Sequence, residues 1–195
     1  MRQLSQLSKI CSIGVLAGLI GCTSIITAST DGPIENNELD RSFGRFIDDE
    51  QIETVVAVNI RHSSETLAEA NISVVSYNGV VLLVGQLSTE EERERVTQIA
   101  REVKGVRQVH NQISISGAIS TLVGANDTYL SAKVRSRFAI SDSDYDFSNI
   151  KVVTENSVVY LMGIVTRTQA DVAVDIARQT GGVQRIVKVF EYAEG

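Results

Sequence analysis

The sequence is short of the residues that most often carry enzyme chemistry, and it has no surplus of positive charge. Its 195 residues include 2 cysteines, 2 histidines and 1 proline, and 18 basic residues stand against 24 acidic ones, for a formal net charge of -6. A nucleic-acid-binding protein should show a basic surplus, so the acidic balance argues against that class. The apolar fraction of 43% is ordinary for a globular protein, and the length allows one medium domain or two small ones.

Neither histidine stands in a pattern that would bind a metal or supply a catalytic base. His62 and His110 occupy non-equivalent positions and lack a metal-ligand spacing such as HExxH. The acidic run Glu90–Arg95 includes two arginines in the first turns of an expected helix, where carboxylates favour solvent and the helix dipole. The glycines near Gly85 do not form a phosphate-binding GxGxxG. The sequence therefore indicates a protein that is not an enzyme and that uses no metal or cofactor.

The N-terminus contains an apolar run, but a short one. Two basic residues precede the uncharged segment Ile10–Ile20, which is too short to span a membrane and suits the central region of a signal peptide. The segment ends in LIGC at Leu19–Cys22, which resembles the bacterial lipobox. The resemblance implies a lipoprotein signal peptide at residues 1–21, cleavage before Cys22 and acylation of this cysteine. The alternative is an ordinary signal peptide with a chance cysteine.

Cleavage at the lipobox would leave the mature domain without a thiol. Cys11 would leave with the signal and Cys22 would carry lipid, so no disulfide framework is expected. Thr23 stands where inner-membrane retention would favour aspartate, which by the lipobox rule indicates the outer membrane of a Gram-negative cell. Residues 22–48 are polar and contain the proline, Pro33. We expect them to form a flexible tether between the membrane and the folded part.

The rest of the chain contains an internal repeat of one sequence unit. Asn71–Gly85 aligns without gaps on Asn149–Gly163, with nine of fifteen positions identical, where chance would give about one. A match of this kind predicts two copies of one fold. We place the first copy at 49–115, the second at 126–194 and a linker at 116–125.

Each copy has the pattern of a helix, two strands, a second helix and a third strand. The dipeptide Asn78-Gly79 between two β-branched runs favours a type I′ hairpin turn, and Asn156-Ser157 is a weaker version of it. Ser88 or Thr89 can cap the second helix, and Gly105 stands where a helix-ending glycine belongs. The predicted fold class is α+β, with two helices packed on a three-stranded mixed sheet in each copy. Domains this small bury only about 60% of their unfolded surface, so we expect the copies to share an interface.

This plan resembles the BON domain. Glycine closes the second strand and ends the second helix in both copies, at Gly85, Gly105, Gly163 and Gly182. The second copy is the closer match, through Asn126–Tyr129, Lys133–Ser136, Val152–Asn156 and Leu161–Gly163. Two such domains behind a lipobox resemble the dual BON-domain outer-membrane lipoproteins. The resemblance implies binding of anionic phospholipid, such as phosphatidylglycerol, by the second domain, a role in outer-membrane integrity and enrichment at division sites.

The first helix of the second copy concentrates positive charge. Aligning Glu53–Ser64 with Asp127–Phe138 keeps the apolar positions and introduces Lys133 and Arg137 beside an arginine present in both copies. On this alignment the loop Ala139–Asn149 is four residues longer than its counterpart. The first copy has 6 basic and 10 acidic residues and the second has 8 and 9. The second copy is therefore better suited to approach an anionic bilayer.

Cations beside an apolar strip, with an aromatic at one end, are typical of a helix that lies in a membrane interface. Each Lys or Arg near an anionic surface contributes about 1 kcal/mol, and an anchor at Cys22 would make such a weak contact sufficient. The residues predicted to contact phospholipid are Tyr129, Lys133, Val134, Arg135, Arg137 and Phe138.

Two other interpretations remain open at this point. The cations can be an ordinary solvated helix face, neutralised by the nearby acids Asp127, Asp142, Asp144 and Asp146. The protein can also be an adaptor or chaperone-like module that binds outer-membrane assembly proteins and is indifferent to lipid charge. The loop with Tyr145 and Phe147 is either a partner-binding loop or a capped turn that places Phe147 under the sheet.

Overall fold

The computed structural model describes residues 43–116 and 121–193, with the side chains of 43 and 121–123 left aside. These residues belong to one compact unit of the chain, Asn37–Gly195. The expected signal peptide, the acylated Cys22 and most of the expected tether lie outside the described residues. The predictions made for them stay predictions.

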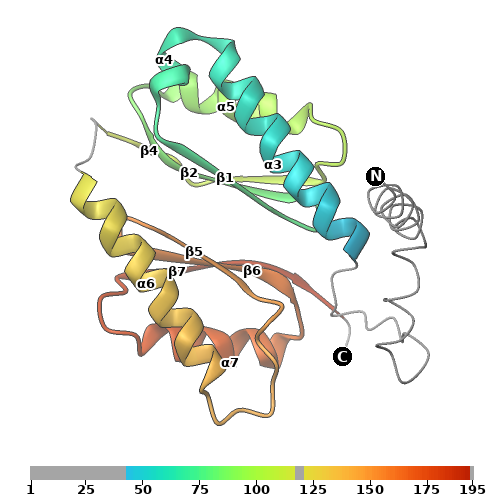
Figure 1. The fold of residues 1–195 in the computed structure, drawn as a ribbon, viewed down its shortest axis with the longest axis vertical. Coiled ribbons are helices and arrows are strands. Elements are labelled where there is room, and N and C mark those ends of the chain that lie inside the picture. Colours follow the sequence, from blue (N-terminus) through green and yellow to red (C-terminus); the bar gives the residue numbers. More distant parts are fainter. Residues whose placement is uncertain (1–42, 117–120, 194–195) are drawn as a thin grey trace, which may run out of the picture. The chain divides into compact units, whose positions relative to one another are not determined.

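The first copy folds as a mixed sheet with helices on one face (Figure 1). Its elements are α3 (Phe43–Ser63), α4 (Glu65–Glu69), β1 (Ile72–Tyr77), β2 (Val80–Leu87), α5 (Glu90–Arg101), β3 (Gln108–Asn111) and β4 (Ser114–Ile115). Strand β2 is central, antiparallel to β1 and parallel to β3 and β4. The expected third strand is interrupted because the Asn111 side chain accepts a hydrogen bond from the Ile113 N–H, which bends the chain between β3 and β4.

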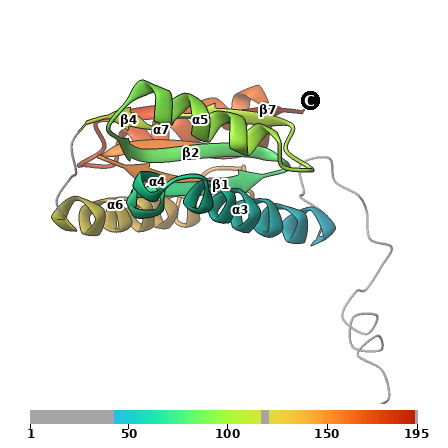
Figure 2. The ribbon, with the colours of Figure 1, turned by 90° about the horizontal axis from the view of Figure 1, so that it is seen from above.

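The second copy repeats this plan. Its elements are α6 (Thr121–Ala139), β5 (Lys151–Glu155), β6 (Val158–Val165), α7 (Arg167–Arg178) and β7 (Arg185–Tyr192). Strand β6 is antiparallel to β5 and parallel to β7, and the ribbon shows α6 and α7 beside this sheet (Figures 1 and 2). The predicted α+β fold with two helices on a mixed sheet is confirmed. The first helix of each copy starts earlier than expected, at Phe43 inside the expected tether and at Thr121 inside the expected linker.

An aspartate of the preceding helix holds each hairpin turn. Asn78-Gly79 has φ of 52° and 75°, and Asn156-Ser157 has φ of 51° and 62°, which confirms the type I′ turns. The carboxylate of Asp49 accepts the N–H groups of the first turn at 2.7 and 2.8 Å. Asp127 accepts those of the second at 2.7 and 2.9 Å. These charged acceptors stabilise a backbone conformation that a non-glycine residue seldom adopts.

The two first helices therefore align differently from the sequence-based alignment. Asp49 and Asp127 have the same role, and the glycine that ends the second helix packs on Ile52 in the first copy and on Leu130 in the second. Asp49 and Asp127, and likewise Ile52 and Leu130, are separated along the chain by the same number of residues as the two hairpin turns. The sequence-based alignment was wrong by one helical turn, because an apolar stripe that recurs about every four residues matches equally well after such a shift.

The corrected alignment changes which residues differ between the copies. Val55 corresponds to Lys133 and Asn59 corresponds to Arg137. The expected insertion at Ala139–Asn149 does not exist, because α4 and its flanks occupy the same length in the first copy. Phe147 of this loop is 5% exposed and its ring lies 5.1 Å from that of a core phenylalanine, so the capped-turn interpretation of the loop is the correct one.

Strand β2 is buried on both faces, which explains its unbroken apolar sequence. Alternate residues of a strand point to opposite faces. One set packs under α3 and α5, with Val81, Leu83 and Leu87. The other set, Val80, Leu82 and Val84, shares a cluster with Tyr160, Met162 and Val189 of the second copy. Each copy thus covers the bare sheet face of the other, and the expected interface between the copies is present.

Candidate functional site

Helix α6 presents its apolar stripe to the core. Leu130, Val134 and Phe138 are 1%, 0% and 7% exposed. Two of the six residues predicted to contact phospholipid, Val134 and Phe138, therefore belong to the core and do not reach the surface. They recur every four residues with Leu130 and share its side of the helix, so the prediction is corrected to Tyr129, Lys133, Arg135 and Arg137.

Lys133 and Arg137 extend from α6 to the end of α7. The Lys133 Nζ donates to the main-chain oxygen of Gly181 at 3.1 Å, and Arg137 Nη1 donates to that of Gln179 at 2.6 Å. Gln179 is the C-cap of α7, where main-chain carbonyls lack helical partners and the helix dipole is negative. The fold thus orients both cations, and each uses only part of its hydrogen-bonding capacity: a lysine has three donors and an arginine has five.

Tyr129 and Arg135 lie open to solvent. The Tyr129 side chain is 61% exposed, its ring lies 5.7 Å from the Lys133 Nζ, and Arg135 is exposed on the other flank of the stripe. We call Lys133, Arg135 and Arg137 the α6 cations. Within the described ranges no carboxylate forms an ion pair with any of them.

Two of the four acids near the α6 cations, Asp127 and Asp146, are engaged elsewhere. The other two, Asp142 and Asp144, are exposed and form no ion pair with these cations within the described residues. Asp127 is 5% exposed and holds the hairpin turn of its own domain. The main-chain N–H and hydroxyl of Ser148 both donate to Asp146, and these hydrogen bonds keep the pKa of the Asp146 carboxyl below its usual value. An anionic ligand at α6 would thus not have to displace an internal carboxylate.

Neither histidine belongs to a metal-binding cluster within the described residues. His110 lies in β3, where burial lowers the pKa of its imidazole, and His62 is exposed near the end of α3. In residues 43–116 and 121–193, the structure places no group of three or more His, Cys, Asp and Glu side chains that could hold a metal ion. Across the same part of the chain, the helices are all too short or too polar to cross a bilayer.

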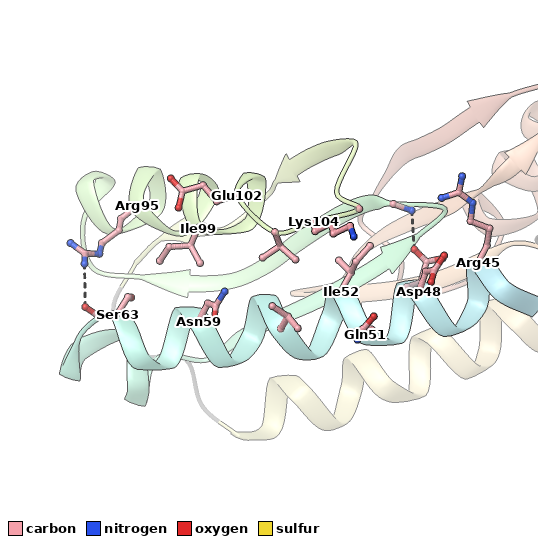
Figure 3. Close-up of a pocket in the computed structure, with 15 residues that line it drawn as sticks. Arg45, Asp48, Gln51, Ile52, Asn59, Ser63, Arg95, Ile99, Glu102 and Lys104 are labelled. Carbon is pink, nitrogen blue, oxygen red and sulfur yellow. Dashed lines mark hydrogen bonds between the residues drawn. The ribbon is translucent and has the colours of Figure 1, made fainter.

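A groove between α3 and α5 of the first copy was missed from the sequence. It encloses about 840 Å³, and Figure 3 shows Ile52 and Asn59 of α3 and Ile99 of α5 directed into the space between the helices. Arg95 Nη2 donates to the Ser63 main-chain oxygen at 3.2 Å and bridges the two helices near the end of α3. The sequence feature that could have predicted the groove is the presence of short side chains, Val55 and Asn59, where the second copy has Lys133 and Arg137. The one-turn error in the alignment hid this difference.

Both apolar and charged side chains line the α3/α5 groove. Ile52, Val55, Ile99 and Val103 supply the apolar side chains, and the charged residues of both signs are Arg45, Asp48, Asp49, Arg95, Glu102 and Lys104.

Comparison with known proteins agrees with the internal repeat. The BON domain family matches residues 48–117 and, a second time, residues 126–194. The chain is 33% identical over 192 residues to the outer membrane lipoprotein DolP of Haemophilus influenzae. The aligned region covers 98% of this chain and 99% of that protein.

Other relatives are similar over most of the chain. The chain is 34% identical over 154 residues to the 21 kDa hemolysin of Actinobacillus pleuropneumoniae, covering 79% of each protein. It is 29% identical over 147 residues to the osmotically-inducible protein Y of Escherichia coli, covering 73% of this chain and 72% of that one.

Proposed function

Since the chain belongs to the BON-domain family and carries two copies of the domain, we propose that it is a non-catalytic lipoprotein of the outer membrane that binds anionic phospholipid through α6. Acylated Cys22 would hold it at the periplasmic face, as the lipobox implies. The similarity to an outer membrane lipoprotein over nearly its whole length supports this location. We include in the proposal a role in outer-membrane integrity and enrichment at division sites, as the family resemblance implies.

The observation that carries the lipid proposal is a set of three cations on one helix that no carboxylate pairs with in the described residues. Arg135 is exposed, and Lys133 and Arg137 are held at the surface by main-chain carbonyls with donors to spare. Phosphate oxygens can accept those remaining donors. The exposed ring of Tyr129 suits the headgroup level of a bilayer. Three cations give about 3 kcal/mol, which an anchored protein can use because the membrane is always near.

Sedimentation with vesicles tests the proposal. The mature chain with Cys22→Ser should sediment with vesicles containing phosphatidylglycerol and remain in solution with phosphatidylcholine vesicles. Arg135→Glu combined with Tyr129→Ser should weaken this binding, because both side chains are exposed and neither bonds to α7. Salt should weaken the binding, since the Debye length is about 8 Å at physiological ionic strength.

The control reverses one positive charge in the other copy. Arg61→Glu changes an exposed residue of α3 and alters the net charge as Arg135→Glu does, so its binding should stay close to that of the parent chain. Equal sedimentation of the α6 variant and the parent chain would refute the role of α6.

The alternative function is that of an adaptor for other envelope proteins, such as those that assemble the outer membrane. The α3/α5 groove favours it, since the helix face beside the groove keeps Val55 and Val58 38% and 42% exposed. An adaptor would keep its protein partner after the α6 changes. Retention of a partner together with indifference to lipid charge would favour this alternative.

A further inference from the structure

In the second copy, basic side chains bind main-chain oxygens at the C-terminal end of the second helix, α7. There, two cations spaced by four residues donate to the main-chain oxygens of Gln179 and Gly181. The corresponding residues of the first copy are Glu102 and Lys104, counted from the glycine that follows each helix. Glu102 is the C-cap of α5, as Gln179 is of α7. The two copies thus present the same carbonyl-rich helix end.

The first copy lacks the cations. Val55 and Asn59 stand at the positions of Lys133 and Arg137, and neither side chain is long enough to reach the end of α5. In the described part of the chain, no hydrogen-bond donor reaches the main-chain oxygens of Glu102 and Lys104. The space that the cationic side chains span in the second copy is the α3/α5 groove of the first.

We propose that the α3/α5 groove binds a basic segment of another protein, which inserts Lys or Arg side chains where the second copy uses its own. The inserted ammonium or guanidinium groups would donate to the main-chain oxygens of Glu102 and Lys104 at the negative end of α5. An adjacent apolar side chain would cover Val55 and Ile99. The groove lining itself has three basic and three acidic residues, and the first copy as a whole, with 6 basic and 10 acidic residues, favours the approach of a cationic partner.

This site is separate from the proposed lipid surface. It belongs to the first copy, whereas Tyr129 and the α6 cations belong to the second. The inference does not depend on lipid binding, and a failure of one proposal leaves the other standing.

A peptide taken from this chain is a suitable probe. A synthetic peptide of residues 126–138, with one tryptophan added at its N-terminus, carries the two cations at the required spacing. The protein contains no tryptophan, so the fluorescence reports on the peptide alone. We expect saturable binding to the mature chain, and a peptide with K133Q and R137Q should bind at least tenfold more weakly, about 1.4 kcal/mol.

Basic side chains introduced on α3 should occupy the groove and block binding of the peptide. The double variant Val55→Lys with Asn59→Arg places the two cations of the second copy in the first, where they can bond to the end of α5. Because both positions are exposed, the variant should fold, with an unfolding temperature equal to or above that of the parent chain. Peptide binding should fall at least tenfold, and the single variant Asn59→Arg should show part of this loss.

The matched control is Val55→Ser with Asn59→Ser, which shortens the side chains and leaves the end of α5 accessible. It should bind the cationic peptide within about fivefold of the parent chain, since one apolar contact is worth about 1 kcal/mol or less. The filled variant leaves α6 intact, so a loss of binding specific to it places the peptide in the first copy.

Three results would overturn the proposal: no saturable binding of the peptide, equal binding of the K133Q/R137Q peptide, or equal binding of the peptide to the filled variant. Loss of phosphatidylglycerol-vesicle binding in the filled variant would instead assign the groove to lipid. Loss of vesicle binding confined to the α6 variant leaves the peptide site unaffected.

Discussion

At the scale of the residue, a few buried polar groups determine local geometry. Asp127 is 5% exposed and accepts two main-chain N–H groups, which keeps Ser157 at a φ of 62°. Glu155 lies at the contact between the copies, where the side-chain amide of Gln86 donates to it. Burial is the main cause that raises the pKa of the Glu155 carboxyl above its ordinary value of 4.5, and the negative charge of Asp127 raises it further. The protein therefore folds more favourably with Glu155 protonated.

Replacing Glu155 by glutamine should make the stability less dependent on pH. A carboxyl whose pKa is raised by folding binds its proton more tightly in the folded state, so stability falls as pH rises from the ordinary value through the raised one. Glu155→Gln cannot ionise and can still accept the bond from Gln86. Its unfolding temperature should exceed that of the parent chain at pH 7, and the difference should vanish near pH 4.

Thermal unfolding between pH 4 and pH 8 measures this effect. Glu94→Gln, at an exposed position of α5, removes one carboxylate without touching the contact between the copies. A gain in stability that is the same at all pH values, or the same in the control, would contradict the assignment to Glu155.

At the scale of the element, α6 combines a core stripe with two cations that bridge to another helix. Lys133 and Arg137 complete the C-terminus of α7 through main-chain carbonyls, and the same side chains border the surface proposed to meet phospholipid. Arg135 has no such bridge in the described residues. The three cations of α6 are therefore not equivalent, and a triple charge reversal would mix a loss of lipid contact with a loss of fold stability.

Removing the two bridging cations should destabilise the protein, whereas removing Arg135 should not. Lys133→Met with Arg137→Met deletes two charge-assisted hydrogen bonds and two favourable dipole contacts. The unfolding free energy should fall by about 1–2 kcal/mol, since both side chains are partly exposed. Arg135→Met should change it by less than about 0.5 kcal/mol.

Urea denaturation of both variants provides the comparison. Equal stabilities of the Lys133/Arg137 and Arg135 variants would show that the bridges to α7 contribute nothing. Vesicle sedimentation of the same samples separates stability from lipid binding, because Arg135→Met is expected to weaken sedimentation without a change in unfolding.

At the scale of the whole described unit, the two sheets share one buried cluster. Leu82 of β2 and Met162 of β6 are both 0% exposed and lie in the cluster between the copies. Lys151 and Glu53 form an ion pair across the same boundary at 2.7 Å, as do Arg107 and Glu191. A cluster shared in this way couples the stability of one copy to that of the other.

Met162→Ala should therefore weaken both copies. Truncation of a buried methionine costs about 2–5 kcal/mol, and the cavity would adjoin β2 as well as β6. Hydrogen exchange of the β1 and β2 amides should become faster, although the change lies in the second copy. Arg178→Ala, exposed on α7, is the control, and unchanged exchange in β1 and β2 would show that the copies unfold independently.

Local patterns in the sequence were sufficient for the elements. The gapless match of Asn71–Gly85 to Asn149–Gly163, the turn at Asn78-Gly79 and a cap at Thr89 correspond to the observed hairpins and helix start. These features depend on residues close together in the chain, so their physics is readable from the chain itself. The mixed sheet followed from the same pattern and is confirmed.

The alignment of the first helices and the partners of their cations depended on tertiary structure. An amphipathic helix keeps its apolar pattern after a shift of one turn, so the apolar pattern alone did not align α3 with α6, and the contacts of Asp49 and Asp127 with their hairpin turns decided the alignment. Whether Lys133 faces solvent or the end of α7 is likewise set by the distance between two helices far apart in the chain. The amino acids thus determined which elements form and which charges they carry, and their packing decided which of those charges remain available to a ligand.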